Sequence, residues 1–314
     1  MEVRVEGQTE WGWKVAAYLS LAGVGAGAYA VGAVADFAQW EPISKIGISM
    51  GFPLLFIGSL FLIADLGVKV RALRAFMNPG TSWIARGTFI ISIFMILGAI
   101  HIAAWIWPFS WLEKLQSLLY ALAAVNLVFA FLAVIYTGVL LGASRPIAFW
   151  STAALPVLFL VSGLSTGLMG ITLVLLGYPG AADAAIEEQL IQLQRIDIFV
   201  IILETVVLAF YLQATHRTVE SVASATLLMK GRLAPAFWGI VVVMGLAIPL
   251  LAGLLEAFFL AETTLLWTGL AASISSVTGL VGGLWLRRLI LAAGVRAPLR
   301  AAGIEFAMPV PTRS

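Results

Sequence analysis

The 314-residue sequence contains no cysteine. This absence excludes disulfide bonds, iron–sulfur clusters held by thiolates, covalently attached c-type haem and a cysteine nucleophile. Histidine is almost as scarce, with only His101 and His216. A haem held between two membrane-spanning helices needs both histidine rings at a similar depth, so the positions of these two residues decide whether such a haem is possible.

Charged residues are also scarce. They make up 11% of the protein, hydrophobic residues make up 61%, and the mean hydropathy is +1.03. A soluble protein of average composition has about 25% charged residues. The sequence therefore predicts an integral membrane protein surrounded by a lipid bilayer, with no nucleic acid partner. Its first ten residues are polar and acidic, so we expect an uncleaved first span instead of a cleaved signal peptide.

Eight apolar segments are long enough to cross a bilayer as helices, at about 20 residues per span. They are predicted at residues 13–36, 44–66, 85–107, 116–141, 148–176, 196–214, 236–260 and 264–290. The expected fold class is thus an all-α integral membrane protein with eight transmembrane helices. Eight spans place both ends of the protein on one side of the membrane, which we call the terminal face, and we call the other side the distal face.

This arrangement excludes a haem held by the two histidines. His101 falls near the distal face and His216 near the terminal face, so their rings cannot ligate one iron. The sequence also shows no cluster of cysteine, histidine and carboxylate residues that predicts a zinc or di-iron site. We expect no haem, no iron–sulfur cluster and no metal in this protein, so any redox role requires a partner that carries the electrons.

Basic residues are distributed unevenly between the two faces. Of the 18 lysines and arginines, only Lys45, Lys114 and Arg195 fall on the distal face, which leaves 15 for the terminal face. Cytoplasmic connections of membrane proteins carry an excess of Lys and Arg. The charge pattern therefore predicts that both termini are cytoplasmic and that the protein lies in the cell's inner (cytoplasmic) membrane.

The connection between the second and third spans, residues 64–88, concentrates charge on the terminal face. Its charged residues are Asp65, Lys69, Arg71, Arg74 and Arg86. Such a group either fixes the topology of the protein or docks an acidic partner subunit. The same connection contains, in order, the patterns D-L-G, R-x-x-R-x-F, N-P and S-W-I-x-R-G.

Further motifs follow a recognisable order along the sequence. The first span reads W-x-x-A-x-Y-L-x-L-x-G-x-x-A-G from Trp13, a YTG begins at Tyr136, and LPVLFLVS-x-x-x-TG begins at Leu155. The last span ends in GGLWLRR, closing at Arg288. Together these motifs resemble the NrfD/PsrC-type family of quinone-reactive membrane subunits, the polysulfide reductase anchor family.

The resemblance implies a fold, a function and partners. The expected domains are a polar segment 1–12, a quinone-binding four-helix bundle 13–141, a second four-helix bundle 142–291 and a tail 292–314. The protein would exchange electrons between a ferredoxin-like four-cluster iron–sulfur subunit and menaquinone or ubiquinone, beside a molybdopterin-type catalytic subunit. Members of this family commonly present their termini to the outside, which is opposite to the orientation that the charge pattern predicts.

The resemblance also implies site residues near the terminal face. The predicted quinone-binding residues are Trp13, Tyr18, Asp65, Arg71, Arg86 and Tyr136. Among them Tyr18 and Asp65 are the expected catalytic pair, because a phenol and a carboxylate supply hydrogen bonds and a proton route. The alternative for Tyr18 is an interfacial belt tyrosine. The predicted docking residues are Lys69, Arg71, Arg74 and Arg86.

Carboxylates within or beside the spans form a separate set of candidates. Asp197 and Glu204 are seven residues apart on one predicted helix face, and Glu256 lies near the distal face. Ionisable groups inside a membrane are costly and often functional. They are either proton-relay members or buried polar contacts that hold helices together. Buried carboxylates also suit a rival class of protein, a polytopic transporter or channel without redox chemistry.

Overall fold

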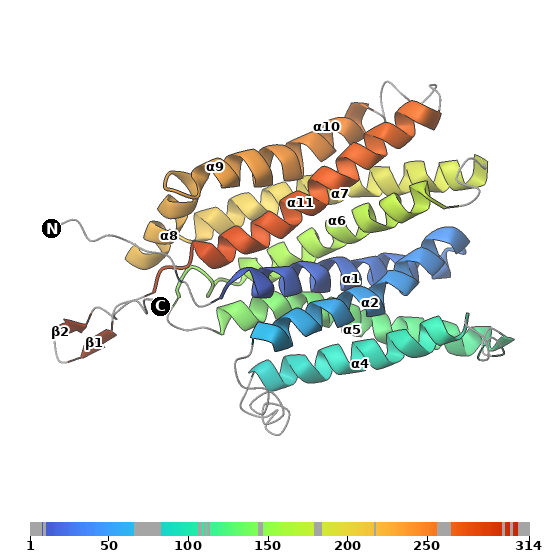
Figure 1. Cartoon of the computed structure of the whole chain (residues 1–314), viewed down its shortest axis with the longest axis horizontal. Coiled ribbons are helices and arrows are strands. Elements are labelled where there is room, and N and C mark those ends of the chain that lie inside the picture. The colour runs from blue at the N-terminus through green and yellow to red at the C-terminus, as the bar shows by residue number, and fades with distance from the viewer. Residues whose placement is uncertain are drawn as a thin grey trace.

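The computed structural model describes residues 8, 11–65, 83–105, 109, 111, 114–143, 147–178, 184–216, 218–255, 265–296, 299–301 and 304–306. Within this part of the protein, eight helical segments are long and apolar enough to cross a membrane. They run side by side along the long axis of the molecule (Figure 1). The predicted all-α membrane fold with eight spans is therefore confirmed.

The helices and strands have the following bounds. The first four spans are α1 (Trp13–Phe37), α2 (Glu41–Asp65), α4 (Trp83–Ala103) and α5 (Gln116–Gly142). The later spans are α6 (Ala154–Leu176), α7 (Ala184–Ala214), the series α9 (Ala234–Ala236), η2 (Phe237–Ala247) and α10 (Ile248–Leu255), and α11 (Leu265–Ala292). The short helix α8 (Val219–Met229) precedes the seventh span, and an antiparallel hairpin of β1 (Leu299–Ala301) and β2 (Ile304–Phe306) follows the eighth.

Helix α7 begins 12 residues earlier than the predicted sixth span at 196–214. The extra segment is rich in Ala, Glu, Gln and Leu, which are strong helix formers. Its Leu190 and Leu193 are buried against the ends of α1, α2 and α6. The low hydropathy of this stretch is typical of a loop. In the structure it extends the helix instead, because its two leucines pack against neighbouring helices.

Helix α6 begins six residues later than the predicted fifth span at 148–176. The residues before it form a turn in which the Trp150 indole N–H donates a hydrogen bond to the Ile290 carbonyl at the end of α11 (2.9 Å). Pro156 consequently lies in the first turn of α6, where its missing N–H breaks no intrahelical hydrogen bond. The turn anchors the start of α6 to the end of α11.

The seventh span contains the π-helix η2, which packs closely on α11. A Cβ atom added to Gly282 would lie 2.1 Å from the Cα of Gly245, so the two backbones are in direct contact there. The change from π to α hydrogen bonding comes at Ile248 and Pro249. A proline at this point has no N–H to donate.

Helix α1 lies at the centre of the assembly and contacts α2, α5, α6 and α11. Its spanning window is 83% buried, more than that of any other span among the described residues. The close approach of α1 and α6 depends on glycine, because a Cβ on Gly27 would lie within 2.0 Å of the Gly163 carbonyl oxygen. Small residues at helix interfaces allow such backbone contact in membranes.

The contacts between helices form two closed groups. We call α1, α2, α4 and α5 the N-terminal group, and α6, α7, η2 with α10, and α11 the C-terminal group; each group closes on itself through neighbouring contacts. Helices α1 and α6 contact each other across the two groups. The division into bundles at 13–141 and 142–291, with 1–12 and 292–314 outside them, stays a prediction with which these contacts are compatible.

The glycine contact between α1 and α6 predicts that the cost of a Gly→Ala substitution depends strongly on which glycine is replaced. Gly27→Ala places a methyl group on the Gly163 carbonyl and should destabilise the fold by about 1–3 kcal/mol, as overpacking does in other cores. Thermal unfolding in detergent measures this change. Gly239→Ala is the matched control, because nothing lies within 4 Å of a Cβ at that position. Equal melting temperatures for the two variants would contradict the proposed contact.

Candidate functional site

Tyr18 lies in the second turn of α1 and is fully buried, at 0% exposure. Its ring and backbone face Gly58 of α2, where an added Cβ would lie 3.6 Å from the ring. The hydroxyl group has no hydrogen-bond partner among the described residues. A buried polar group without a partner costs about 1–3 kcal/mol, so a ligand or water that accepts its proton would stabilise this site.

Tyr136 from α5 lies beside Tyr18 and is also buried. Its ring rests on Gly87 of α4, and a Cβ at Gly87 would overlap the ring at 1.7 Å from Cζ. The two tyrosines are close enough for the phenol of Tyr136 to act electrostatically on that of Tyr18. All four helices of the N-terminal group thus contribute to this position, two with tyrosines and two with the glycines that make room for them.

Three of the other predicted quinone-binding residues lie at the terminal end of the same helix group. Trp13, Asp65 and Arg86 are exposed, in contrast to the two buried tyrosines. Trp13 packs edge-on against Phe61 at 5.6 Å between ring centroids. The Arg86 guanidinium lies 4.7 Å from the centroid of the Trp83 ring.

The start of α1 and the end of α2 are tied together beside Asp65. Lys14 donates a hydrogen bond from Nζ to the carbonyl of Ala64 (3.2 Å). This contact places Asp65 at the terminal face, next to the first turn of α1. Lys69, Arg71 and Arg74 lie outside the described residues, and so does Glu256.

A second polar group lies within the C-terminal group. Asp197 and Glu204 are buried, with 8% and 5% of their surface exposed. The Ser165 hydroxyl donates a hydrogen bond to the Asp197 carboxylate (3.0 Å). The Ser162 hydroxyl interacts with the Glu204 carboxylate. The serines of α6 therefore connect both carboxylates of α7 to the neighbouring helix.

Arg287 of α11 completes this group and is fully buried. Its Nη1 donates hydrogen bonds to the Gly283 carbonyl (2.9 Å) and to the Ser162 hydroxyl (3.2 Å). Its charge interacts with that of Glu204. The guanidinium also reaches α1, because a Cβ added to Gly23 would lie within 2.4 Å of Nη2. Arg287 thus joins α1, α6, α7 and α11.

The role of Arg287 is not visible in the sequence, where it is one of the 15 basic residues of the terminal face. Its neighbour Arg288 is exposed and stacks 4.6 Å from the Trp285 ring centroid. The sequence around these two adjacent arginines does not indicate which of them is buried. Glu204, which supplies the opposite charge, is 83 residues away in the sequence. The only signal in the sequence for a buried cation was therefore this carboxylate within an apolar span, with no Lys or Arg close to it in sequence.

Two small cavities adjoin the buried carboxylates. One of about 10 Å³ is lined by Glu204, Ser165 and Thr166, and another of about 10 Å³ by Asp197 and Gln194. This volume is near the space that the centre of a single water molecule needs. The carboxylates therefore lie next to cavities whose volume is close to that of a single water site.

The two histidines lie at opposite ends of the molecule. His101 is buried near the distal end of α4 and forms a hydrogen bond with Tyr29, whereas His216 is exposed just after the terminal end of α7. Among the described residues, no group of three or more His, Asp or Glu side chains is arranged to hold a metal ion. The predicted separation of the histidines agrees with this placement.

Comparison with known protein families identifies the relatives of this protein. The family described as "Polysulphide reductase, NrfD" matches residues 3–298. The protein belongs to the NrfD family. This membership confirms the resemblance inferred from the motifs, and it covers both helix groups.

One relative of this NrfD-family protein is the C subunit of polysulfide reductase from Wolinella succinogenes. The two sequences are 29% identical over 269 residues, and the match covers 76% of this protein and 81% of the relative. Family membership and the eight spans together make the protein a multi-pass membrane subunit of the NrfD type.

The Arg287–Glu204 pair predicts a coupled effect on stability. Arg287→Met removes the hydrogen bonds that Nη1 donates to Ser162 and Gly283, together with the positive charge that acts on Glu204, and should lower the stability by about 1–3 kcal/mol. Melting of the purified protein in detergent measures the loss. Arg288→Met, at the neighbouring exposed position, should have little effect.

The double variant Arg287→Met/Glu204→Gln tests the pairing itself. Removal of both charges should recover much of the loss, since no unpaired charge then remains buried. Additive losses in the double variant would show that the two residues act independently.

Proposed function

We propose that this NrfD-family protein is the membrane anchor of a multi-subunit respiratory oxidoreductase and exchanges electrons between an iron–sulfur subunit and the quinone pool. The observation that carries the proposal is the buried Tyr18 hydroxyl, which has no partner among the described residues and lies beside Tyr136. A tyrosine hydroxyl in an apolar surrounding normally has a hydrogen-bond partner. A quinone carbonyl is an acceptor that matches this donor.

The hydroxyl groups of the two tyrosines would suit the carbonyl oxygens of a quinone head group. When bound, menaquinone or ubiquinone would accept two electrons and two protons, or release them as the quinol. Tyr18 and Tyr136 would orient the carbonyl oxygens by hydrogen bonds within apolar walls. Asp65, exposed at the end of α2, would exchange protons with water at the terminal face. Trp13, Arg71 and Arg86 would border the entrance.

The buried carboxylates form a second part of the proposal. Asp197 and Glu204, with Glu256 nearer the distal face, would relay protons through the C-terminal group. The water-sized cavities beside Glu204 and Asp197 support this role, because proton transfer between carboxylates needs bridging donors and acceptors. Arg287 would hold the Glu204 carboxylate in place through its charge.

The name of the relative supports a multi-subunit assembly. A C subunit of polysulfide reductase implies further subunits in that enzyme. For the present protein we propose a ferredoxin-like four-cluster iron–sulfur subunit and a molybdopterin-type catalytic subunit. The iron–sulfur subunit would dock on Lys69, Arg71, Arg74 and Arg86, where basic side chains attract an acidic surface.

Tyr18→Phe tests the quinone site. The variant should lower quinone-linked turnover by about tenfold or more, since one lost hydrogen bond to a ligand costs about 1–3 kcal/mol. It should not lower the melting temperature, because the removed hydroxyl has no partner among the described residues. Turnover of the assembled complex and binding of a quinone-site inhibitor measure the effect.

Tyr211→Phe is the matched control. Tyr211 is equally buried, but its hydroxyl donates to the Phe149 carbonyl (3.0 Å). This variant should lose stability and keep its affinity for quinone. If Tyr18→Phe retains normal turnover and inhibitor binding, Tyr18 is not part of the site.

Arg71→Ala/Arg74→Ala tests the docking surface. The double variant should release the iron–sulfur subunit, or make its binding more sensitive to salt, because exposed charge pairs are screened by ions. Co-purification at increasing ionic strength measures this. Lys230→Ala/Arg232→Ala removes two basic residues from another connection on the same face and should leave binding unchanged. If both variants bind the iron–sulfur subunit normally, the basic residues of the connection 64–88 serve only to set the membrane topology.

The orientation is a separate prediction. We propose that both termini are cytoplasmic in the inner membrane; without the buried Arg287, 14 of the remaining 17 basic residues are still on the terminal face. A single cysteine introduced at Ser314 should react with an impermeant thiol reagent only after the cells are permeabilised. Labelling of intact cells would instead place the termini outside, as in many relatives of the family.

A further inference from the structure

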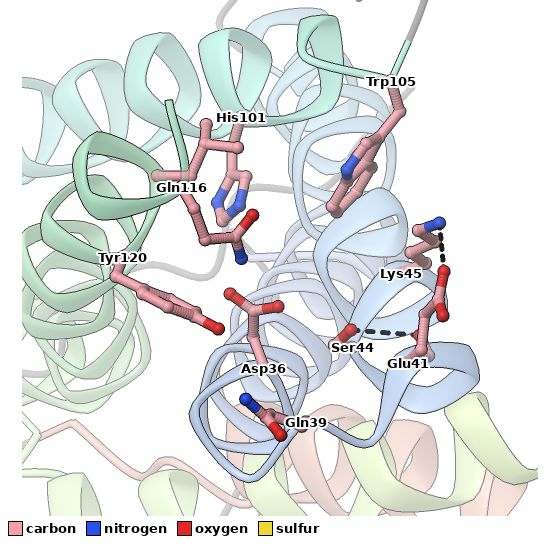
Figure 2. Close-up of a pocket in the computed structure, with 10 residues that line it drawn as sticks. Asp36, Gln39, Glu41, Ser44, Lys45, His101, Trp105, Gln116 and Tyr120 are labelled. Atoms are coloured by element: carbon pink, nitrogen blue, oxygen red, sulfur yellow. Dashed lines mark hydrogen bonds and ion pairs between the residues drawn. The ribbon is translucent and has the colours of Figure 1, made fainter. Parts of the chain in front are cut away.

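A cavity of about 250 Å³ opens between the distal ends of the four helices of the N-terminal group. It lies at the opposite end of these helices from Tyr18. Polar side chains point into it from separate elements: Asp36 from α1, His101 from α4, and Gln116 and Tyr120 from α5 (Figure 2). Polar side chains from several helices therefore line the cavity, which distinguishes it from a gap between apolar helix faces.

The charges around the cavity are mostly negative. Asp36 and Glu41 contribute two carboxylates, and Lys45 contributes one amine that pairs with Glu41. Asp36, at the end of α1, forms no salt bridge among the described residues and lies near the other polar groups (Figure 2). The cavity is thus lined by more negative than positive charge. Such a cavity at a membrane face attracts protons and other small cations.

The inner wall of the cavity is formed by a buried hydrogen-bonded pair. His101 is 1% exposed, and its Nδ1 lies 3.1 Å from the Tyr29 hydroxyl. Tyr29 is fully buried in α1. Asn126 of α5 lies beside the Tyr29 hydroxyl, yet neither its amide nitrogen nor its amide oxygen has a hydrogen-bond partner among the described residues.

These groups continue inward along one face of α1. Asp36, Tyr29 and Tyr18 are separated by seven and 11 residues, which places them on the same side of a helix with 3.6 residues per turn. Tyr29 and Tyr18 are about 16 Å apart along the axis at 1.5 Å per residue. Ala22 and Ala26 occupy the interval and have small side chains.

We propose that the cavity is a proton-access vestibule from the distal face, in which the His101–Tyr29 pair passes protons toward the tyrosine site. The inference rests on the proposed function, because quinone chemistry at Tyr18 consumes or releases protons. It is distinct from the carboxylates of the C-terminal group, which belong to other helices.

The transfer step conserves atoms and charge. A proton from water binds Nε2 of His101 while the Nδ1 proton passes to the Tyr29 oxygen, and the Tyr29 hydroxyl proton passes to a water molecule that the unpaired Asn126 amide would hold on the inner side. One proton has then moved inward and both side chains are neutral again. The ionisable groups that face His101 are Asp36 and Tyr29 from α1, Glu41 and Lys45 from α2, and Tyr120 from α5.

Single-cysteine labelling tests whether water fills the cavity, and the protein offers no competing native cysteine. Leu119 lines the cavity and is 5% exposed; on the same helix, Ala130 is buried at 0% and Val128 is 57% exposed on the outside of the assembly. In membranes containing the full-length protein, a charged thiol reagent should modify Leu119→Cys at least about tenfold faster than Ala130→Cys or Val128→Cys, because thiolates form where water reaches. Equal, slow labelling of all three overturns the proposal.

A second experiment tests the proton transfer in the assembled complex. His101→Ala should lower quinone-linked turnover by about a hundredfold, near the low end of what a positioned proton-transfer group contributes. Its affinity for a quinone-site inhibitor should not change. Free imidazole, which fits the vestibule, should restore turnover. Tyr29→Phe should slow turnover similarly and not respond to imidazole, since its missing hydroxyl lies beyond the histidine.

The outcomes separate this inference from the proposed function. Normal turnover by His101→Ala with normal inhibitor binding overturns the vestibule and leaves the quinone site intact. A wild-type complex that neither binds the inhibitor nor turns over quinone instead removes the proposed function. Slow turnover of His101→Ala without rescue, together with a lowered melting temperature, assigns His101 a structural role and also overturns the vestibule.

Discussion

A buried cation, Arg287, lies where helices of the two groups meet, beside the glycine contact of α1 with α6. An ionised guanidinium in an apolar interior is costly unless opposite charge and hydrogen-bond acceptors surround it. Arg287 meets this requirement in part: its Nη1 donates to Ser162 and to the Gly283 carbonyl, and the charge of Glu204 acts on it, whereas its Nε and Nη2 have no hydrogen-bond partner among the described residues. Gly23 is needed because any larger residue would occupy the space of the guanidinium. Arg287 therefore constrains, together with the glycine contacts, how α1, α6, α7 and α11 meet.

The N-terminal group differs, since none of its described Asp, Glu, Lys or Arg side chains is buried and its buried polar groups include the phenols of Tyr18, Tyr29 and Tyr136. Tyr211 in the C-terminal group shows the usual arrangement, in which the hydroxyl is bound to a backbone carbonyl. Tyr18 departs from it, with a buried hydroxyl that no described residue accepts. Glycines at 58 and 87 make space for the Tyr18 and Tyr136 rings. The fold thus keeps two phenols in an apolar site and leaves one of them available to a ligand.

Sequence predicts the parts of this structure that are local. The eight spans follow from hydropathy alone, because the apolar length of a helix is a property of contiguous residues. The early start of α7 could not be predicted, since it depends on Leu190 and Leu193 packing against other helices. The closeness of Tyr18 and Tyr136 came from family motifs, while the exposure of Asp65 at the end of α2 could not be read from them. The proximity of Arg287 and Glu204 could not be predicted from the sequence, because only folding brings their two helices together.

We propose that the tyrosine pair binds quinone. The most direct measurement is covalent labelling of the assembled complex by a quinone analogue that carries a photoreactive group on its head group, followed by peptide mapping. We predict labelled peptides from the first turns of α1 and the last turns of α5, around Tyr18 and Tyr136, and competition by unlabelled quinone. Competable labelling confined to the C-terminal helix group, with none on α1 or α5, would contradict it.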